Sequence, residues 1–335
     1  EYCTVGDDGI LCVWDLFSHK PKTFRDMEAP ARCCAYSPDG QYLAVGFGGS
    51  IGNRKSKHSG AVRIYRGDTL LQVCELKEAK QWISAIKFSP NGSVLAVGAR
   101  DNSVYMYSVA QQFRRKSKFS KHNAGILDFD FTNDGKYLQS TCSAYEILFS
   151  NTNSGAQLAN GASFLSDEEW ATYTCTLGWP VIGIWSGSMD GSDVNSADRS
   201  PSGKLIATGD DFGKVNCYMF PCTIDGGAPK NAYAGHSSHV TNVRWVSLSA
   251  YGKKKTDDFL ISLGGNDKTI MQWKVISSES HGVNSESNAV AVDVHDSSIA
   301  LLEDGPTGGD EFMATKAWLG AIRAPSAWVS PDVAK

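Results

Sequence analysis

The sequence predicts an all-β fold made of repeated antiparallel units. Its apolar segments are short and rich in β-branched and aromatic residues, Gly and Pro separate them, and almost nothing is patterned as a helix. A tight turn after an aromatic strand end recurs along the chain, first at Tyr36-Ser-Pro-Asp-Gly40. The stretch from Gly235 to Val275 adds a Gly-His pair, an alternating strand, an Asp-containing turn and a strand ending on Trp273. Together these observations predict a β-propeller of WD-repeat blades.

The recurring turn gives the repeat its length. The turns follow residues 36, 88, 131, 199 and 245, at intervals of 52, 43, 68 and 46 residues. A blade of four short strands takes about 40–45 residues, so two intervals fit and two contain insertions. We expect about six to seven blades, the first of them incomplete, because residues 2–15 supply a second and a third strand without a first. An opened ring would expose unpaired strand edges, so we expect the missing strands before Glu1 and a longer polypeptide around this piece.

The last repeat predicts the hydrogen-bonded network that holds a WD blade together. His236 lies in the loop before the first strand, Asp267 in the turn between the second and third strands, and Trp273 on the third strand. The strand position four residues before Asp267 holds Leu263. We therefore expect this network to lack the Ser or Thr hydroxyl that would complete it.

The first repeat has the same pattern with a hydroxyl. Thr4, Asp8 and Trp14 lie at the spacing that a hydrogen-bonded blade needs. The His that would complete this network is expected upstream of Glu1. Only the first and last repeats keep both the Asp and the Trp.

The middle repeats lose members of the network. Phe212 stands where one repeat should have its Asp, Val97 occupies a hydroxyl position, and His122 fills the Gly-His slot of the repeat that follows. Five third strands are expected to end in an aromatic residue, namely Tyr65, Tyr107, Phe149, Tyr218 and Trp273. We expect these atypical blades to be held together mainly by apolar packing between sheets.

Composition excludes several classes of protein. The chain has 335 residues with 41% hydrophobic and 20% charged residues, as in ordinary globular proteins. A net charge of -4 argues against broad binding to nucleic acid. The sequence has no apolar run of about eighteen residues that could span a membrane. Its nine cysteines lack disulfide or zinc spacing and indicate reduced thiols in a cytosolic protein.

The sequence shows no catalytic or metal-binding constellation. Ser188 is not in the strand–turn–helix context of a nucleophile elbow. The segment Met189–Asp193 lacks the spacing and terminal Glu of a calcium loop. His236 and His239 lie close together, but His236 is explained by the blade network. We therefore expect no enzyme, no cofactor and no metal site.

Four unusual strings carry a family resemblance. They are Glu169-Trp-Ala-Thr-Tyr-Thr-Cys175, Thr208-Gly-Asp-Asp-Phe-Gly213, Gly235-His-Ser-Ser-His-Val-Thr-Asn242 and Ile270-Met-Gln-Trp273. Together, in this order, they resemble the echinoderm microtubule-associated protein-like (EML) family. The resemblance covers roughly residues 1 to 276 and implies the second of two tandem atypical propellers, accompanied by a HELP motif.

The predicted domain boundaries follow from this resemblance and from composition. Residues 1–276 are expected to form the propeller, and the polar residues 277–308 a linker. Residues 309–335 turn apolar and aromatic again. They resemble the start of a further HELP-type unit, as in the long members of the family, and a strap packed on the propeller is the alternative.

Three basic clusters are candidate binding sites: Arg54–Lys57, Arg114–Lys118 and Lys253–Lys255. The first is an insertion between the second and third strands of its blade. The second runs along an outer strand, where lysines also protect an exposed edge. The third lies in a loop between first and second strands, and so on the opposite face from the first. We select two clusters as candidates for tubulin binding, with the residues Arg54, Lys55, Lys57, Lys253, Lys254 and Lys255.

Two functions remain open at this point. The resemblance implies a non-catalytic microtubule-associated propeller, whose basic loops would meet the acidic tails of tubulin. The alternative is a general protein-interaction scaffold whose microtubule contact lies elsewhere in the full-length chain. Tubulin and microtubules are the expected partners, with other cytoskeletal or axonemal proteins as further ones and neither nucleic acid nor membrane. The expected location is the cytoplasm on microtubules, with the ciliary axoneme as the variant.

Overall fold

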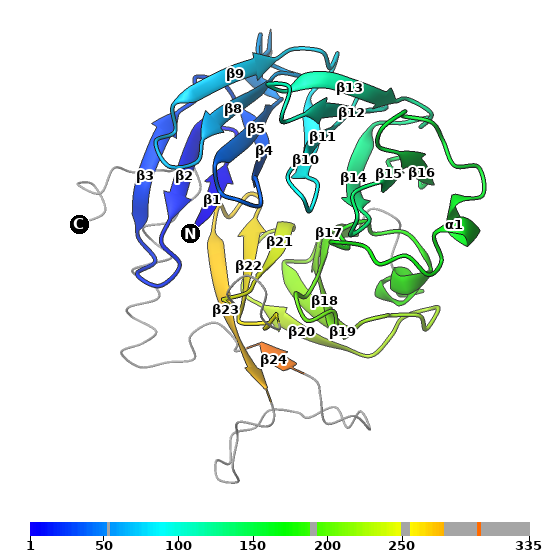
Figure 1. The fold of residues 1–335 in the computed structure, drawn as a ribbon. Helices are drawn as coiled ribbons and strands as arrows, with labels where there is room; N and C mark the ends of the chain where they lie inside the picture. The colour runs from blue at the N-terminus through cyan, green and yellow to red at the C-terminus, as the bar shows by residue number, and fades with distance from the viewer. Residues whose placement is uncertain (52–53, 188–192, 249–254, 278–299, 303–335) are drawn as a thin grey trace. The chain divides into compact units, whose positions relative to one another are not determined.

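Within the described ranges almost all regular elements are antiparallel strands in the computed structural model, which confirms the predicted all-β class (Figure 1). The structure describes residues 1–51, 54–187, 193–248, 255–277 and 300–302. It divides into two compact units, Glu1–Leu177 and Gly178–Lys335, and each is considered by itself. No helix within the described ranges is long and apolar enough to cross a membrane.

The first unit holds four sheets and a small hairpin among its described residues. The first sheet contains β1 (Tyr2–Val5), β2 (Ile10–Trp14) and β3 (Pro21–Asp26). The second contains β4 (Ala31–Tyr36), β5 (Tyr42–Phe47), β8 (Val62–Arg66) and β9 (Gln72–Leu76), with the hairpin of β6 (Ser50–Ile51) and β7 (Arg54–Lys55) inserted after β5. The third contains β10 (Ile83–Phe88), β11 (Val94–Ala99), β12 (Ser103–Ser108) and β13 (Arg114–Phe119). The fourth contains β14 (Ile126–Phe131), β15 (Tyr137–Cys142) and β16 (Ile147–Asn151), followed by the short helix α1 (Gly161–Phe164).

The second unit holds two further sheets in its described part. After a 3-10 helix (Trp179–Ile184) come β17 (Val194–Arg199), β18 (Leu205–Asp210), β19 (Lys214–Met219) and β20 (Lys230–Ala234). The last sheet contains β21 (Val240–Val246), β22 (Phe259–Gly264), β23 (Ile270–Ser277) and β24 (Ala300–Leu302). β24 falls in the segment assigned to a linker, and the predicted strap at 309–335 lies outside the described residues.

The sheets repeat one another in register, as expected for blades. A β-bulge interrupts the first strand of five sheets at the same place, near Ala31, Ile83, Ile126, Val194 and Val240. A bulge fixes the local twist and the side-chain register of the residues beyond it. Equivalent positions in different sheets can therefore be compared through their strand partners.

The recurring turn forms because its polar residues bond to their own backbone. The Ser37 hydroxyl accepts a hydrogen bond from Tyr42 N at 2.9 Å, and the Asp39 carboxylate accepts one from Gln41 N at 3.0 Å. Gly40 takes the positive φ of 69° that the turn requires. The same arrangement returns at Ser89–Gly92 and in a related form at Thr132–Gly135.

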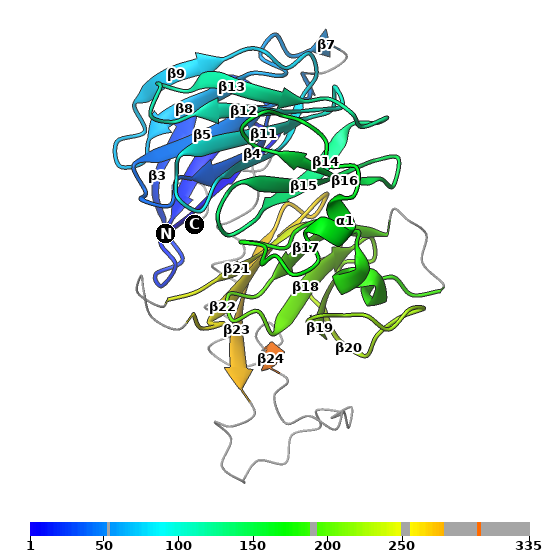
Figure 2. The same cartoon turned by 45° about the vertical axis from the view of Figure 1, so that its right-hand side comes forward.

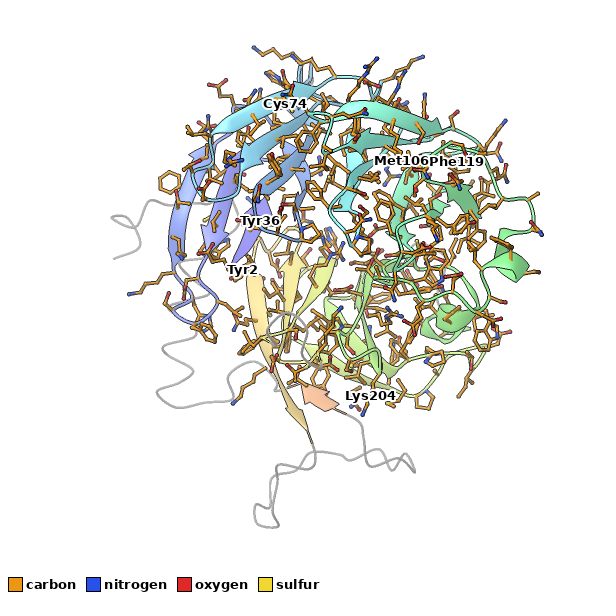
Figure 3. The ribbon with its side chains drawn as sticks, in the orientation of Figure 1. Tyr2, Tyr36, Cys74, Met106, Phe119 and Lys204 are labelled. Carbon is orange, nitrogen blue, oxygen red and sulfur yellow. The ribbon has the colours of Figure 1, made fainter. Side chains whose placement is uncertain are left out.

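Neighbouring sheets within a unit bury their facing side chains. One apolar cluster in the first unit joins the β10–β13 sheet to the β14–β16 sheet, and it includes Met106 and Phe119 (Figure 3). Gly98 permits this approach, because a Cβ there would lie 2.8 Å from Ile126 and 3.2 Å from Phe129. Similar clusters join the other neighbouring sheets of the first unit and the two sheets of the second.

Four of the five predicted third-strand aromatics occupy one equivalent buried position. Their strand partners show this: Leu43 pairs with Tyr65, Leu95 with Tyr107, Ile206 with Tyr218 and Leu260 with Trp273. The prediction for Phe149 is wrong. In β16 the residue that pairs with Leu138, and so takes this position, is the fully buried Ser150.

Candidate functional site

The polar network of the last sheet is complete. Trp273 Nε1 donates to Ser262 Oγ at 2.8 Å, and His236 Nε2 lies 2.7 Å from the same oxygen. His236 Nδ1 lies 3.1 Å from the Asp267 carboxylate. We predicted from Leu263 that this network has no Ser or Thr hydroxyl, and that prediction is wrong because Ser262 supplies one. The turn is one residue longer than assumed, so the hydroxyl comes from five residues before Asp267 instead of four.

Burial governs the protonation of this network. It lowers the pKa of His236, although the Asp267 carboxylate acts in the opposite direction. The neutral ring with Nδ1–H facing Asp267 leaves Nε2 as an acceptor for the Ser262 O–H. The Ser262 oxygen can then accept from the Trp273 indole, so one hydroxyl serves both partners.

The first sheet has part of the same network. Trp14 Nε1 donates to Thr4 Oγ1 at 2.9 Å, which joins two of the three residues assigned from the sequence. Asp8 instead accepts a hydrogen bond from Ile10 N at 3.0 Å within its turn. Burial raises the pKa of Asp8, as expected for a carboxylate with a half-enclosed site and few donors.

The sheet containing β18 replaces its network. Phe212 stands in the turn at the Asp position and is 68% exposed. Asp210, which ends β18 and is buried, accepts from Asn216 Nδ2 and from Lys214 N, both at 2.9 Å. A carboxylate two residues earlier thus fixes the turn, which frees Phe212 from a structural role.

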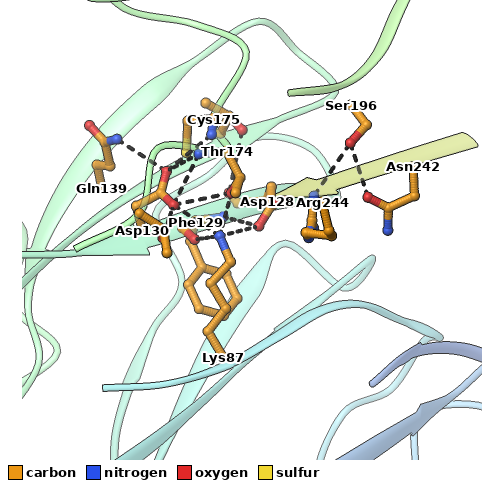
Figure 4. A network of polar contacts seen from close by, with 12 residues as sticks. Lys87, Asp128, Phe129, Asp130, Gln139, Thr174, Cys175, Ser196, Asn242 and Arg244 are labelled. Atoms are coloured by element: carbon orange, nitrogen blue, oxygen red, sulfur yellow. Dashed lines mark hydrogen bonds and ion pairs between the residues drawn. The ribbon is translucent and has the colours of Figure 1, made fainter. Parts of the chain in front are cut away.

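A buried carboxylate ties the Trp-rich insertion of the first unit to its sheet. Asp130 on β14 is fully buried and faces Thr174 and Cys175 of the insertion (Figure 4). Its oxygens accept hydrogen bonds from Lys87 Nζ (2.9 Å), Gln139 Nε2 (3.2 Å), Thr172 Oγ1 (2.5 Å), Thr174 N (2.9 Å) and Cys175 N (3.0 Å). Lys87 also reaches Asp128 at 3.0 Å. Asp130 therefore fixes three residues of one of the four strings that mark the family resemblance, and Ala171 N adds a backbone hydrogen bond to Phe131 O at 2.8 Å.

The surroundings keep Asp130 ionised. Burial alone would raise the pKa of this carboxyl. The charge of Lys87 and the hydrogen bonds from Thr172 and Thr174 outweigh burial and hold the pKa well below its usual range.

The predicted basic cluster Arg54–Lys57 lies on a hairpin, which we call the arm and define as residues 50–57. β6 and β7 pair through Ser50 with Lys55, and Figure 2 shows β7 extending beyond the neighbouring strands. At its base Ser56 N donates to Gly49 O at 3.2 Å. Gly60, with a φ of 90°, returns the chain close to the Ala79 carbonyl. Lys57 is exposed at this base.

A partly buried arginine holds the chain just after the arm. Arg63 donates to Glu75 Oε1 at 3.1 Å and to Met27 O at 3.0 Å, and its guanidinium carbon lies 4.7 Å from the Phe47 ring centroid. His58 Nδ1 lies 3.1 Å from the same guanidinium. Burial and then the charge of Arg63 lower the pKa of His58, so the positive charge here belongs to the arginine.

Two further arginines lie against one tryptophan beside the arm. The guanidinium carbons of Arg32 and Arg100 lie 5.2 Å and 4.8 Å from the Trp82 ring centroid. Arg32 Nε also lies 3.4 Å from the Gly48 carbonyl at the base of the arm, and a Cβ on Gly48 would overlap Trp82. We call Arg32, Trp82 and Arg100 the Arg–Trp–Arg stack. It places two positive charges in a cation–π arrangement near the base of the arm.

The Arg–Trp–Arg stack was not predicted from runs of basic residues in the sequence, because its members are far apart in the chain. A positional signal was available. Arg32 lies near the start of β4, Trp82 directly precedes β10 and Arg100 directly follows β11. In an antiparallel sheet, the start of the first strand lies next to the end of the second strand.

The other predicted basic residues lie apart from the arm in the chain. Lys255 is exposed in the loop between β21 and β22, in the second unit, and Lys253 and Lys254 fall outside the described residues. The cluster Arg114–Lys118 forms the outer strand β13, as predicted, and Arg115 pairs with Glu78 at 2.6 Å. The structure thus places Gly48 and Gly49, at the base of the arm, next to Arg32 and Trp82 of the Arg–Trp–Arg stack.

The repeated sheets and the His–Ser–Trp network define a β-propeller of atypical WD-repeat blades. Residues 1–275 match the family described as the echinoderm microtubule-associated protein second beta-propeller. The chain belongs to this family.

Sequence identity to curated relatives extends along most of the chain. It is 35% identical over 84% of its length to echinoderm microtubule-associated protein-like 4 of Xenopus tropicalis. It is 36% identical over 82% of its length to the like-1 protein of Rattus norvegicus, and 34% identical over 84% to the like-3 protein of Homo sapiens. These matches cover 29%, 32% and 30% of the relatives, so the chain spans about a third of their length.

Proposed function

We propose that this propeller is a non-catalytic microtubule-binding module, and that the arm together with the Arg–Trp–Arg stack contacts tubulin. The relatives are named as microtubule-associated proteins, which supports the class of partner. The observation that carries the proposal is local. The chain at the base of the hairpin β6–β7 lies next to Arg32 and Trp82 at Gly48, and Arg100 lies against the same Trp82 ring.

The chemistry of this surface suits an acidic and extended partner. A chain with a net charge of -4 does not attract anions as a whole, so any attraction is local to such a patch. Acidic peptide tails of the kind that tubulin carries provide many carboxylates within one screening length of about 10 Å at 0.1 M salt. Arg32 forms an ion pair with the Asp7 carboxylate at 2.9 Å, which partly neutralises its positive charge. The arm adds three basic residues, Arg54, Lys55 and Lys57.

We propose Lys253–Lys255 as a second contact with tubulin. Lys255 is exposed in the loop that follows the first strand of its sheet. The arm connects the second and third strands of its sheet, whereas the Lys255 loop connects the first and second strands of its own. The two loops therefore lie at opposite strand ends of their respective sheets.

Co-sedimentation with polymerised tubulin tests this function. The chain is expected to sediment with microtubules at about 0.05 M salt and to be released as salt approaches about 0.3 M, because screening shortens the reach of exposed charges. Microtubules whose acidic tails have been removed by limited proteolysis are expected to bind less. If neither salt nor removal of the tails changes the amount of chain that sediments with microtubules, the electrostatic contact is contradicted.

A specific apolar surface favours a second function, an interaction scaffold whose microtubule contact lies elsewhere in a longer chain. Trp179, in the 3-10 helix of the second unit, is 70% exposed. Ile182 and Ile224 are also exposed, and the hydrogen bond from Gly183 N to Cys222 O, at 2.8 Å, brings their segments together. Exposed aromatic and aliphatic side chains of this kind occur in protein interfaces.

The two functions differ in a simple measurement. If the scaffold function is correct, this chain fails to sediment with microtubules at any salt, while the full-length protein still does. If the tubulin function is correct, the chain alone sediments, and Trp179→Ser leaves its affinity unchanged. Cytoplasmic microtubules are the proposed location, with the ciliary axoneme as the variant that imaging of the tagged chain would distinguish.

A further inference from the structure

The fourth sheet keeps only part of the blade network. His122 Nε2 lies 2.7 Å from Ser140 Oγ, just as His236 Nε2 lies 2.7 Å from Ser262 Oγ in the last sheet. Glu146 takes the place of the turn carboxylate, since it accepts from Asn123 N at 3.1 Å. The corresponding bond in the last sheet joins Ser237 N to Asp267 at 3.0 Å.

A cysteine enters this network at a position where the last sheet has glycine. Cys142 pairs with Ile126, and the equivalent pair in the last sheet is Gly264 with Val240. A Cβ on Gly264 would overlap the carboxylate of Asp267. The Cys142 side chain therefore occupies the space that a turn carboxylate fills elsewhere. The thiol is fully buried and lies 3.3 Å from Glu146 Oε2.

The substitution leaves a buried ring nitrogen unsatisfied. In the last sheet His236 Nδ1 bonds to Asp267 at 3.1 Å and to Thr269 at 2.9 Å. His122 Nδ1 has no hydrogen-bond partner among the described residues, and its closest carboxylate oxygen, on Glu146, is 3.6 Å away. The His122 side chain is 0% exposed, so water does not satisfy this nitrogen from bulk solvent. An orphaned polar atom in a buried cluster requires an explanation.

We propose that His122 Nδ1, Cys142 Sγ and a Glu146 carboxylate oxygen form a binding site for a divalent transition metal of the zinc class. The three donor atoms already lie within 4.8 Å of one another. Tetrahedral zinc, with bonds of about 2.0–2.3 Å, would place them about 3.3–3.6 Å apart. Two of the separations, 3.3 Å and 3.6 Å, are in this range already.

The residues behind the donors support the same assignment. Metal-bound histidines donate their second ring N–H to a fixed acceptor, which sets the tautomer. Ser140 Oγ is such an acceptor for His122 Nε2–H. No indole competes for this oxygen, because Ser150 stands where the last sheet has Trp273. The backbone N and side chain of Asn123 hold the Glu146 carboxylate in place.

The three side chains are of the types that bind a zinc-class metal, namely an imidazole, a thiol and a carboxylate. On binding, the Cys142 thiol would release its proton to solvent and the thiolate would join the metal. Glu146 is 27% exposed, which leaves a fourth position open to water.

Titration with Co²⁺ as a spectroscopic probe tests the site in the purified chain, freed of metal with a chelator. One equivalent is expected to produce a thiolate-to-cobalt charge-transfer band in the near ultraviolet, together with the visible bands of tetrahedral Co²⁺. Equimolar Zn²⁺ is expected to remove these bands, because zinc binds such donor sets more tightly than cobalt. Absence of a charge-transfer band at saturating Co²⁺ would overturn the proposal.

Variants assign the band to these residues. Cys142→Ser keeps the size of the side chain and is expected to abolish the charge-transfer band, whereas Cys74→Ser, on β9, is expected to keep it. Ser140→Ala removes only the second hydrogen bond of His122, and it is expected to weaken Co²⁺ binding by about 10- to 100-fold. Circular dichroism confirms that each variant is folded. A band that persists in Cys142→Ser would overturn the site even if the protein binds cobalt.

Discussion

Trp273 and Ser262 share a hydrogen bond of 2.8 Å, from the indole Nε1 to the hydroxyl, and the same bond joins Trp14 to Thr4 in the first sheet at 2.9 Å. These bonds link the third strand of a sheet to its second through side chains, in addition to the backbone ladder. In the last sheet the bond extends through His236 to the loop that precedes the first strand. One hydroxyl therefore connects three segments of the blade.

Replacing this hydroxyl should destabilise the last sheet. Ser262→Ala leaves the indole N–H of Trp273 and the Nε2 of His236 unpaired in a buried site, which costs about 1–3 kcal/mol. Urea denaturation followed by tryptophan fluorescence measures this loss as a lower transition midpoint with an unchanged slope. Ser237→Ala, at an exposed neighbour that contributes its backbone N–H, is the control and should stay within about 0.5 kcal/mol. Equal midpoints for both variants would show that the network carries no stability.

Removing the charge of Asp130 should release the insertion from its sheet. Asp130→Asn leaves Lys87 without its buried partner and replaces an acceptor with a donor facing Thr174 N, so we expect a loss of about 3–5 kcal/mol. Hydrogen exchange should accelerate first at the amides of Thr174 and Cys175. Asp128→Asn is the matched control, since Asp128 also contacts Lys87 at 3.0 Å but is partly exposed. A global loss without faster exchange at these two amides would contradict the role of Asp130 as a local anchor.

Asp130 also predicts an acid-sensitive stability. Its pKa in the folded protein is held below the usual range, because the Lys87 charge and hydrogen bonds outweigh burial. Below about pH 4 the unfolded chain therefore binds a proton that the folded chain does not, and stability falls as pH falls. Urea midpoints measured between pH 6 and pH 3 should decline less steeply for Asp130→Asn than for the wild type. Parallel declines would mean that other carboxylates govern the acid response.

The repeats could be predicted from the sequence because they depend on local chemistry. Turns such as Tyr36–Gly40 bond to their own backbone, and the alternating strands follow from side-chain period. The arm was also predictable in outline, since an insertion between two strands of a blade must project from their shared edge. The family assignment rested on uncommon strings in order, and residues 1–275 match it.

The errors arose where spacing was treated as fixed. A fixed spacing assigned the hydroxyl position of the network to Leu263 and so predicted that the hydroxyl is missing, but the longer turn gives this position to Ser262. An aromatic at position 149 suggested a third-strand anchor, whereas the strand register gives that place to Ser150. Shifts of a single residue reverse the face of a strand, and single-sequence patterns do not fix them.

Long-range groupings could not be read from the chain at all. The residues next to Asp130 in the sequence do not indicate that it binds residues some forty positions later. Its role depends on how the insertion folds back onto β14. The Arg–Trp–Arg stack combines three residues from separate segments, namely β4, the residue before β10 and the residue after β11. Such sites follow from the tertiary fold.

Charge reversal on the arm is the most direct test of the proposed function. The variant Arg54→Glu/Lys55→Glu/Lys57→Glu is compared with Arg114→Glu/Lys116→Glu/Lys121→Glu, which makes the same change in net charge at exposed positions on and after β13. Exposed ion pairs contribute about 0.2–1 kcal/mol each, so three reversals should weaken microtubule co-sedimentation by about tenfold or more. The account predicts this loss for the arm variant and little change for the control. Equal affinity of the arm variant and the wild type, or equal losses in both variants, would contradict it.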